Sequence, residues 1–398
     1  MANFEKIFKN NFDRLPKVFI DNLSNANLKF DVHTHIFNFE YIPDEFFDVR
    51  FPTLVNISFL KGIDSLLDVI KQDSEDSLYN YAYFLDFINK NSTEQIAEYL
   101  ISNSPQNTIF CTLMVDYSKV FSAKNSKSIE EQMDLLFKIR NKYPQTFLPF
   151  IGIDPNNPNV FDNFEKAFSE QYSFFGVKVY PALGFMPSHP NLMKIFEICQ
   201  NYNIPVVAHC NIDGTHTTKS KIQLKFFDID SSGKLILKKE TKQFFFKHQY
   251  NKFFNRPQLW EPVLKAFPNL RLNLAHFDCD FDFEDDKKSQ NVYRLIDLME
   301  RYPNVYSDTA YCLHKPTYAS KFVEFYTNNT IIQQRLLFGS DFHYINAEGK
   351  YKELRSRFVS KIGSKIMHRI SVENPLKFLD LYKLIPQQVI KQWEQQTL

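Results

Sequence analysis

Short apolar runs alternate along the chain with segments whose apolar residues recur at helical spacing. The runs are rich in Val, Ile, Leu and Phe and are almost continuous, which is typical of strands buried on both faces of a parallel sheet. Helical spacing is clear in 190–202 and 292–302. A strand, a helix and their loops need about 30 residues, and several of the runs keep that step. Eight strands are predicted, over residues 28–35, 108–116, 147–154, 174–180, 204–209, 271–276, 304–307 and 336–341.

This alternation indicates the α/β class. An open doubly wound sheet would require a Gly-rich phosphate-binding turn after its first strand, and the sequence has none. We therefore predict a (β/α)8 TIM barrel, which commonly exceeds 300 residues as one unit. With 398 residues and 44% hydrophobic content, the chain can bury a large core. One domain over residues 1–398 is expected.

Two long gaps interrupt the alternation, and both predict insertions. The first, about 36–107 after strand 1, contains partial helical periodicity at 66–70 and 85–88. The second, about 211–256 after strand 5, contains Asp230-Ser231-Ser232-Gly233-Lys234 between apolar segments, which predicts a hairpin. Insertions at these places are expected to form a lid and pocket walls, although a solvated decoration is equally compatible with the hairpin tip.

Candidate chemistry lies at the carboxyl ends of four predicted strands. His33 and His35, two residues apart, point to one side of strand 1, where they can hold one cation. Strand 5 ends in His209, strand 6 in His276 and strand 8 in Asp341. A single histidine after a buried strand is more often a satisfied core residue than a ligand. Together, however, the five residues form the ligand set of a metal hydrolase, at the end of a barrel where active sites lie.

Charge and cysteine content limit the partners. The chain has 47 Lys and Arg against 46 Asp and Glu, so its net charge of +1 predicts neither nucleic-acid nor membrane binding. The five cysteines form no Cys-x-x-Cys pair, and neither a disulfide framework nor a thiolate zinc site is predicted. No apolar stretch of about 18 residues is present and the start lacks a signal-peptide core, so a cytoplasmic protein is expected. A homo-oligomer is compatible with the aromatic content, with Tyr306 as one interface candidate.

Several motifs resemble those of the amidohydrolase superfamily of metal-dependent barrel enzymes, in particular the branch that contains metal-dependent decarboxylases. The resemblance runs from strand 1 to the last helix and leaves the insertions unmatched. The similar segments are Asp31-Val32-His33-Thr34-His35, Gly176-Val177-Lys178-Val179-Tyr180-Pro181, Ala208-His209-Cys210, Leu274-Ala275-His276-Phe277, Phe338-Gly339-Ser340-Asp341 and Glu373-Asn374-Pro375.

The resemblance implies that His33, His35, His209 and Asp341 contact metal. It leaves His276 two roles, as a ligand of a second metal ion or as a group that activates and positions water. Lys178 also has two interpretations. It becomes carboxylated and bridges two ions, as in binuclear members, or it binds a substrate carboxylate or phosphate as a cation.

The ligands predict zinc as the cofactor, although Mn, Fe or Co would fit similar sites. Zinc lowers the pKa of bound water to about 7 and so supplies a nucleophile near neutral pH. Asp341 is the expected general base, His276 would polarise the carbonyl or hold the water, and Asp308 would orient a neighbouring group. Tyr180 and Phe37 are expected pocket walls, and His216 and His343 are candidate substrate contacts.

Three function classes follow for a small-molecule substrate. The leading one is a hydrolase of a C–N or C–O bond next to a carbonyl. The second is a nonoxidative decarboxylase of an aromatic or unsaturated carboxylic acid, for which Arg256 is a candidate carboxylate partner. The third, a noncatalytic binding barrel, would have no need for this complete ligand set, although a fold alone does not prove activity.

Overall fold

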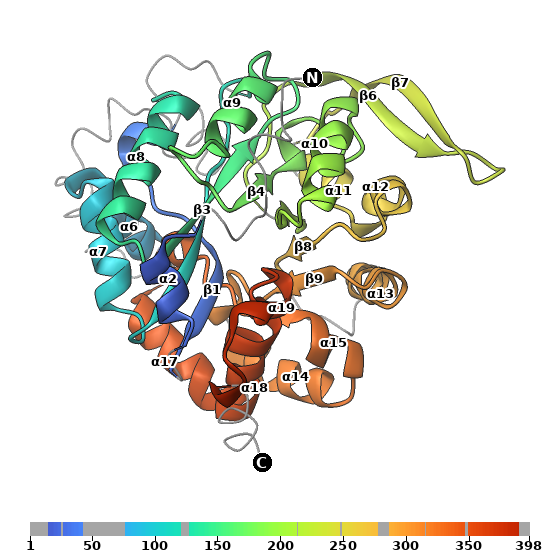
Figure 1. The fold of residues 1–398 in the computed structure, drawn as a ribbon. Helices are drawn as coiled ribbons and strands as arrows, with labels where there is room; N and C mark the ends of the chain where they lie inside the picture. The colour runs from blue at the N-terminus through green and yellow to red at the C-terminus, as the bar shows by residue number, and fades with distance from the viewer. Residues whose placement is uncertain are drawn as a thin grey trace.

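The computed structural model describes most of the chain. The described residues are 15–24, 27–42, 76–120, 127–212, 214–246, 249–277, 286–314, 316–346 and 349–389. Helices surround a central set of strands, and a long hairpin projects from one side (Figure 1). Cys111, Cys199 and Cys210 carry thiols, whereas Cys312 is disulfide-bonded, although the cysteine spacing predicted no disulfide framework.

Eight parallel strands form the central sheet, in the order β1-β2-β3-β4-β5-β8-β9-β10. Their bounds are β1 (Lys29–Thr34), β2 (Thr108–Leu113), β3 (Phe147–Ile153), β4 (Gly176–Val179), β5 (Val206–His209), β8 (Leu272–Ala275), β9 (Val305–Asp308) and β10 (Leu336–Leu337). Two backbone hydrogen bonds join the ends of the sheet: the Val32 amide donates to the Phe338 carbonyl at 2.9 Å, and the Asp341 amide donates to the His33 carbonyl at 2.8 Å. The predicted TIM barrel and its eight strands are confirmed.

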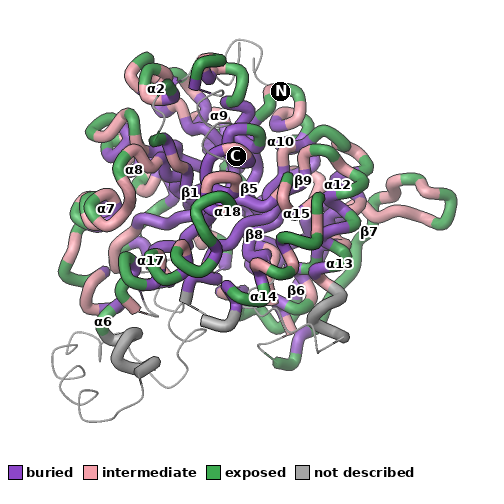
Figure 2. Tube along the Cα trace, turned by 90° about the horizontal axis from the view of Figure 1, so that it is seen from below, coloured by how far each residue is buried: buried purple, intermediate pink, exposed green. Residues whose placement is uncertain are grey.

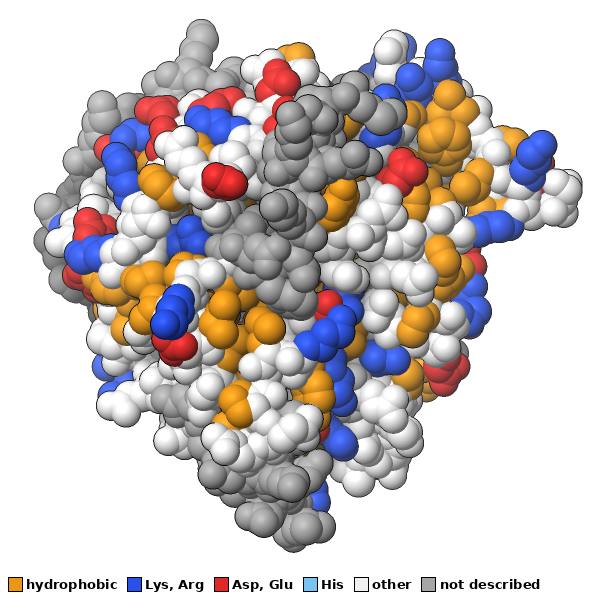
Figure 3. All heavy atoms as spheres, viewed as in Figure 1, with side chains coloured by type: hydrophobic (Ala, Val, Ile, Leu, Met, Phe, Trp, Pro, Cys, Tyr) orange, Lys and Arg blue, Asp and Glu red, His pale blue; other side chains and the backbone are white. Residues whose placement is uncertain are grey.

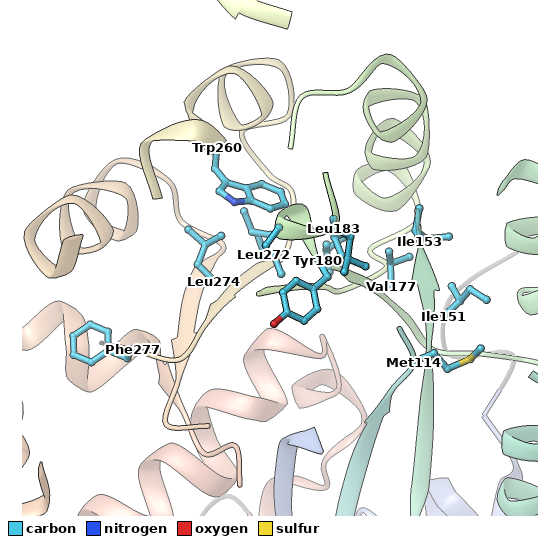
Figure 4. Packing of buried hydrophobic residues seen from close by; sticks show 14 of the residues in the cluster. Met114, Ile151, Ile153, Val177, Tyr180, Leu183, Trp260, Leu272, Leu274 and Phe277 are labelled. Carbon is cyan, nitrogen blue, oxygen red and sulfur yellow. The ribbon is translucent and has the colours of Figure 1, made fainter. Parts of the chain in front are cut away.

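Alternate residues of the strands enter two apolar clusters, which explains why the runs are apolar on both faces. One cluster contains Phe30 and Val32 of β1, with Ile109 of β2 and Phe150 of β3, together with residues of the N-terminal α2 (Lys17–Asn22). The other contains the opposite faces of the strands and the inner faces of the surrounding helices. Its packing is seen around Ile151, Val177 and Leu272 (Figure 4).

Helices follow the strands as the alternation predicts. They include α8 (Ile129–Lys142), α9 (Val160–Ala167), α10 (Pro190–Asn201), α12 (Glu261–Ala266), α13 (Asp286–Arg301), α14 (Pro316–Thr327), α15 (Thr330–Arg335), α17 (Tyr351–Ile362), α18 (Ser364–His368) and α19 (Asn374–Phe378). The terminal motif has a structural role, because the buried Asn374 amide donates to the Leu336 carbonyl at 2.7 Å and so ties α19 to β10.

The insertion after β1 is helical where the structure describes it. It contains α6 (Asp76–Lys90) and α7 (Thr93–Ser102), and Leu85 and Ile88 are buried as their spacing predicts. The apolar residues at 66–70 lie outside the described residues. Ser92 and Gln95 form a capping box at the start of α7.

The insertion after β5 contains the predicted hairpin, formed by β6 (Lys221–Ile229) and β7 (Leu235–Gln243). Asp230 makes the turn, because its carboxylate accepts the backbone amides of Ser232 and Lys234. One face of β6 packs on α10 and α12, while most of β7 is exposed (Figure 2). The hairpin is therefore an exposed projection rather than the lid that its position suggested.

Three further expectations concern the surface of the protein. Tyr306 is 2% exposed and packs inside the chain against Phe378, so it is not available as an oligomer interface. Acidic, basic and apolar side chains are interspersed on the face seen in Figure 3, in keeping with the near-zero net charge. In the part of the chain that the structure describes, no helix combines the length and apolar character that a membrane span needs.

Candidate metal centre

Three predicted ligands meet at one end of the barrel. His33 lies on β1, His35 directly follows it, and Asp341 follows β10, which is the neighbour of β1 across the closure of the sheet. One ligand atom from each residue lies within 4.8 Å of the other two, and all three side chains are buried. A spacing of this size allows one ion to contact all three residues.

Both β1 histidines are held with Nε2 available to a metal. The His33 Nδ1–H donates to Oδ2 of Asp308 at 2.9 Å, and the His35 Nδ1–H donates to the Leu113 carbonyl at 2.7 Å. A neutral imidazole carries one ring proton, so these bonds leave Nε2 of each ring as an acceptor. Burial, followed by the charge of Lys178, lowers the pKa of both rings well below the ordinary value. Both histidines are therefore neutral at pH 7, as metal binding requires.

The chain must turn sharply to bring Asp341 to these rings. Asp341 has φ 52°, in the left-handed region, and Gly339 precedes it where a Cβ would lie 2.7 Å from Cβ of His33. Only glycine allows this close approach. The turn explains why β10 ends at Leu337 although the apolar run predicts a strand through 341. Oδ1 of Asp341 lies 3.8 Å from Nε2 of His35.

Lys178 reaches the same centre from β4. Its Nζ lies 3.3 Å from Nε2 of His33 and donates to it, and the side chain is 1% exposed. Burial lowers the pKa of this ammonium to about 8, against the opposite pull of Asp308 and Asp341. A metal ion at Nε2 of His33 would further favour the neutral amine through repulsion between cations.

His209 and His276 form a hydrogen-bonded pair beside the cluster of His33, His35 and Asp341. Nδ1 of His209 lies 3.0 Å from Nε2 of His276, and Nδ1 of His276 lies 3.1 Å from the Ala310 carbonyl. The His276 ring also packs at 4.8 Å from the ring of His33. The structure thus brings the four histidines predicted as ligands or water-positioning groups to one place, but His209 is outside the group of three residues whose ligand atoms lie within 4.8 Å of one another.

Asp308 connects His33 to the His209–His276 pair. Oδ2 accepts from His33 and from Nδ2 of Asn273 at 2.7 Å, and Oδ1 accepts from the backbone amides of His276 at 2.9 Å and Ala310 at 3.0 Å. The carboxylate is fully buried. Asp308 therefore fixes one ring directly and the backbone of another, a larger role than the sequence indicated.

A pocket of about 130 Å³ opens over this centre. Tyr180 forms one wall, because its ring stacks on His209 at 4.1 Å and its hydroxyl accepts from the Thr215 amide at 2.8 Å. In Figure 4 this hydroxyl points away from the packed side chains of Val177 and Leu183. The lining residues are His33, His35, Val115, Lys178, Tyr180, His209, Asn211, Gly214, His276, Tyr311, Asp341 and Tyr344.

Four other residues that the sequence predicted near the substrate do not line this pocket. His216 stacks on Tyr250 at 4.9 Å, within the insertion after β5. His343 is fully buried with its ring 3.9 Å from that of Phe37, and burial lowers its pKa to about 3. Phe37 instead lines a small neighbouring cavity together with His35. Arg256 is exposed and donates to the Lys252 carbonyl.

The sequence analysis missed Asn211, Tyr311 and Tyr344 as pocket residues. Tyr311 follows Asp308 by three residues and Tyr344 follows Asp341 by three, so each lies in the segment that follows a site carboxylate at the carboxyl end of the barrel. That position was the available signal, because the loops at the carboxyl ends of barrel strands build the site.

The sequence profile described as amidohydrolase matches residues 123–381, which is well over half of the chain. The chain belongs to the amidohydrolase family. No curated protein matches this amidohydrolase.

Solved structures similar to this amidohydrolase include decarboxylases. A 2,6-dihydroxybenzoate decarboxylase complexed with 2,6-dihydroxybenzoate has a TM-score of 0.52 and 12% identity, over 89% of this chain and 99% of that chain. A 5-carboxyvanillate decarboxylase from Novosphingobium aromaticivorans, complexed with manganese and 4-hydroxy-3-methoxy-5-nitrobenzoic acid, has a TM-score of 0.53 and 12% identity, over 89% and 96%. At such low identity the likeness supports the fold alone.

Proposed function

We propose that this amidohydrolase is a metal-dependent hydrolase that cleaves a C–N or C–O bond next to a carbonyl in a small molecule. The observation that carries the proposal is the buried group formed by His33, His35 and Asp341, whose ligand atoms lie within 4.8 Å of one another. Two neutral imidazoles and a carboxylate are the donor types that zinc and similar divalent ions take. The donors therefore fit the metal that the family implies.

His33 and His35 would hold the ion through Nε2, with Asp341 and His209 completing the set. Zinc is the first choice from these nitrogen and oxygen donors, and Mn, Fe or Co would be accepted by similar donors. A divalent ion in such a site polarises a carbonyl oxygen and makes water more acidic. Its binding would be favoured by the anchored Nδ1 atoms, which fix both β1 rings before the ion arrives.

The protein groups supply proton transfer and orientation. We assign Asp341 as general base: its carboxylate takes the proton of the attacking water and later gives it to the leaving group. The neighbouring His276 ring lies in the pocket wall, and the Tyr180 hydroxyl is held by the Thr215 amide beside His209. The small pocket and the bulk of Tyr311 and Tyr344 limit the substrate to a small molecule.

A nonoxidative decarboxylase is the second candidate. Lys178 favours it, because a buried lysine at the pocket floor can pair with a carboxylate, and tyrosines form the walls on which a planar acid could pack. The decarboxylases with this fold include one from Polaromonas sp. with bound manganese and 2-nitroresorcinol, at a TM-score of 0.50, 12% identity and coverage of 89% of this chain and 97% of that chain. Arg256 does not support this candidate, because it is exposed away from the pocket.

One experiment separates the two candidates. Zinc- or manganese-loaded protein is incubated in ¹⁸O-water with a panel of small amides, lactones, esters and hydroxylated benzoates, and the products are analysed by mass spectrometry. The hydrolase predicts a product that carries one ¹⁸O from water and no release of carbon dioxide. Release of carbon dioxide with no ¹⁸O in the remaining product would establish the decarboxylase. If no compound in the panel were turned over, or if turnover did not require Asp341, both candidates would be contradicted.

A further inference from the structure

Charge is distributed unevenly between the hairpin and the rest of the chain. Residues 219–243, which contain β6 and β7, have seven lysines and three acidic residues, a net charge of +4, whereas the whole chain has a net charge of +1. The near-zero total therefore conceals a basic projection on a slightly acidic body. Basic and apolar side chains lie side by side on this projection, at the upper right of Figure 3.

The two faces of the hairpin differ in charge. Opposed residues of β6 and β7 share a face, and the face of Ile222, Leu224 and Phe226 is turned toward the barrel, because these three side chains are buried. Both acidic residues of the two strands, Asp228 and Glu240, belong to this inner face. The outer face of the strands therefore has no acidic side chain.

The outer face is both basic and apolar. Its cations, Lys221, Lys225 and Lys239, are exposed, and none of them forms an ion pair within the part of the chain that the structure describes. Leu237 is 48% exposed on the same face, and Phe245, just beyond the end of β7, is 74% exposed. The other members of the face are Gln223, Phe227, Ile229, Leu235, Thr241 and Gln243. Exposed apolar groups among unpaired lysines are typical of a binding surface.

We propose that the outer face of the hairpin docks on an anionic lipid surface. Lysine ammonium groups bind lipid phosphates while their stems, together with Leu237 and Phe245, lie between the headgroups. All seven cations of the hairpin are lysines. Flexible point charges suit a fluid layer of headgroups, whereas arginine is typical of rigid, bidentate sites. The surface is separate from the metal centre, so the inference does not depend on the proposed function.

A second copy of the chain fits this face less well. The outer edge of β7 could in principle add to the same edge of another copy, since β6 and β7 form a sheet of two strands. However, three of the nine residues of β7 are lysines. Lysines on an edge strand oppose pairing between strands of two molecules, because like charges are brought together. The charge of the face instead complements an anionic partner.

The first test measures binding of the full chain to vesicles by co-sedimentation. Vesicles of phosphatidylcholine alone are compared with vesicles that contain roughly a third phosphatidylserine. We expect binding to the anionic vesicles only, and weaker binding as salt is raised. The triple variant Lys221→Glu, Lys225→Glu and Lys239→Glu should bind at least about 100-fold more weakly, since each lysine near an anionic surface contributes about 5-fold.

A matched control separates the hairpin from net charge. The triple variant Lys138→Glu, Lys352→Glu and Lys365→Glu changes the charge equally, but at exposed positions of α8, α17 and α18. It should bind the anionic vesicles like the unaltered protein. Circular dichroism checks that both triple variants keep the fold.

The second test concerns the apolar side chains. The double variant Leu237→Ser with Phe245→Ser keeps every lysine and should bind anionic vesicles about 10-fold more weakly, because less apolar surface enters the headgroup layer. The control Tyr293→Ser removes a ring that is 58% exposed on α13 and should leave binding unchanged.

Three results would overturn the proposal. One is no binding of the unaltered protein to anionic vesicles, or equal binding by the two triple variants. Another is binding to polyglutamate that is as tight as binding to vesicles, which would assign the face to acidic chains. The third is a dimer, detected by light scattering, that becomes a monomer in the Leu237→Ser and Phe245→Ser variant, which would show that a second copy covers the face.

Discussion

The two sides of the centre hold their histidines differently. On the side of β1 and β10, His33 and His35 are anchored to Asp308 and to the Leu113 carbonyl, and their Nε2 atoms face a lysine and a carboxylate. On the side of β5 and β8, His209 and His276 are anchored to each other. The ligand atoms of the first side lie within 4.8 Å of one another, whereas the two rings of the second side share a hydrogen bond. Equal residue types at equivalent strand ends therefore do not have equal surroundings.

The largest effect is expected on the β1 side. The double variant His33→Ala with His35→Ala removes two of the three clustered ligands, so the protein should lose its bound metal and its activity should fall to background. Elemental mass spectrometry and turnover measure both effects, and circular dichroism checks the fold. His216→Phe, in the insertion, is the matched control. Full metal content in the double variant would place the ion elsewhere.

Asp341→Asn tests the carboxylate on the same side. The amide keeps the size of the side chain and its backbone bond to His33, but it cannot accept a proton. Turnover should fall by about 10²–10⁴-fold, the usual contribution of a general base. The rate is measured at saturating metal, so that weaker metal binding does not mimic the loss. Turnover within a few-fold of the unaltered enzyme would remove Asp341 from its assigned role.

Asp308→Asn tests the carboxylate that connects the two sides, because it accepts from His33 and from the His276 amide. We expect metal affinity about 10–100-fold lower. The ¹⁵N-histidine spectrum should show changed tautomers for His33 while His209 and His276 stay paired. If His33 kept its Nδ1 proton and the metal affinity were unchanged, the hydrogen bond from His33 to Asp308 would not contribute to metal binding.

The smallest effect concerns His343, which lies outside both sides. Burial lowers its pKa to about 3 from the ordinary 6.5. At pH 7 the ring is neutral in the folded and unfolded chains. Below pH 6.5 the unfolded chain binds a proton at this ring, whereas the folded protein binds it only near pH 3. The free energy of unfolding therefore falls across this window. At pH 5 the loss should be about 2 kcal/mol.

His343→Phe should remove this share of the acid sensitivity. The new ring fits among Phe37 and Phe84, which already pack against His343. Urea unfolding at pH 7 and pH 5 measures the free energy of unfolding for both proteins. An equal loss of stability in the two proteins between these pH values would contradict the buried neutral state of His343.

The sequence predicted the barrel well because buried parallel strands leave a strong apolar pattern, as in residues 147–154 and 204–209. It also placed His33, His35, Lys178, His276 and Asp341 at one end, since strand ends converge in a barrel. The loops were less predictable. His216 and His343 follow strands at distances that suit pocket residues, yet side-chain packing turns them toward Tyr250 and Phe37.

The different surroundings of the histidines had no sequence signal. His209 and His276 both follow buried strands, and only the folded structure pairs the two rings and places the Ala310 carbonyl against His276. The role of Asp308 was similarly hidden, because it depends on four donors that come from different strands and turns. Such contacts require the folded arrangement.

The most direct measurement is a crystal structure of zinc-loaded protein with anomalous data collected at the zinc edge. We expect a peak within bonding distance of Nε2 of His33, Nε2 of His35 and a carboxylate oxygen of Asp341. A peak elsewhere in the molecule, or none from protein that has been supplied with zinc, would contradict the metal centre.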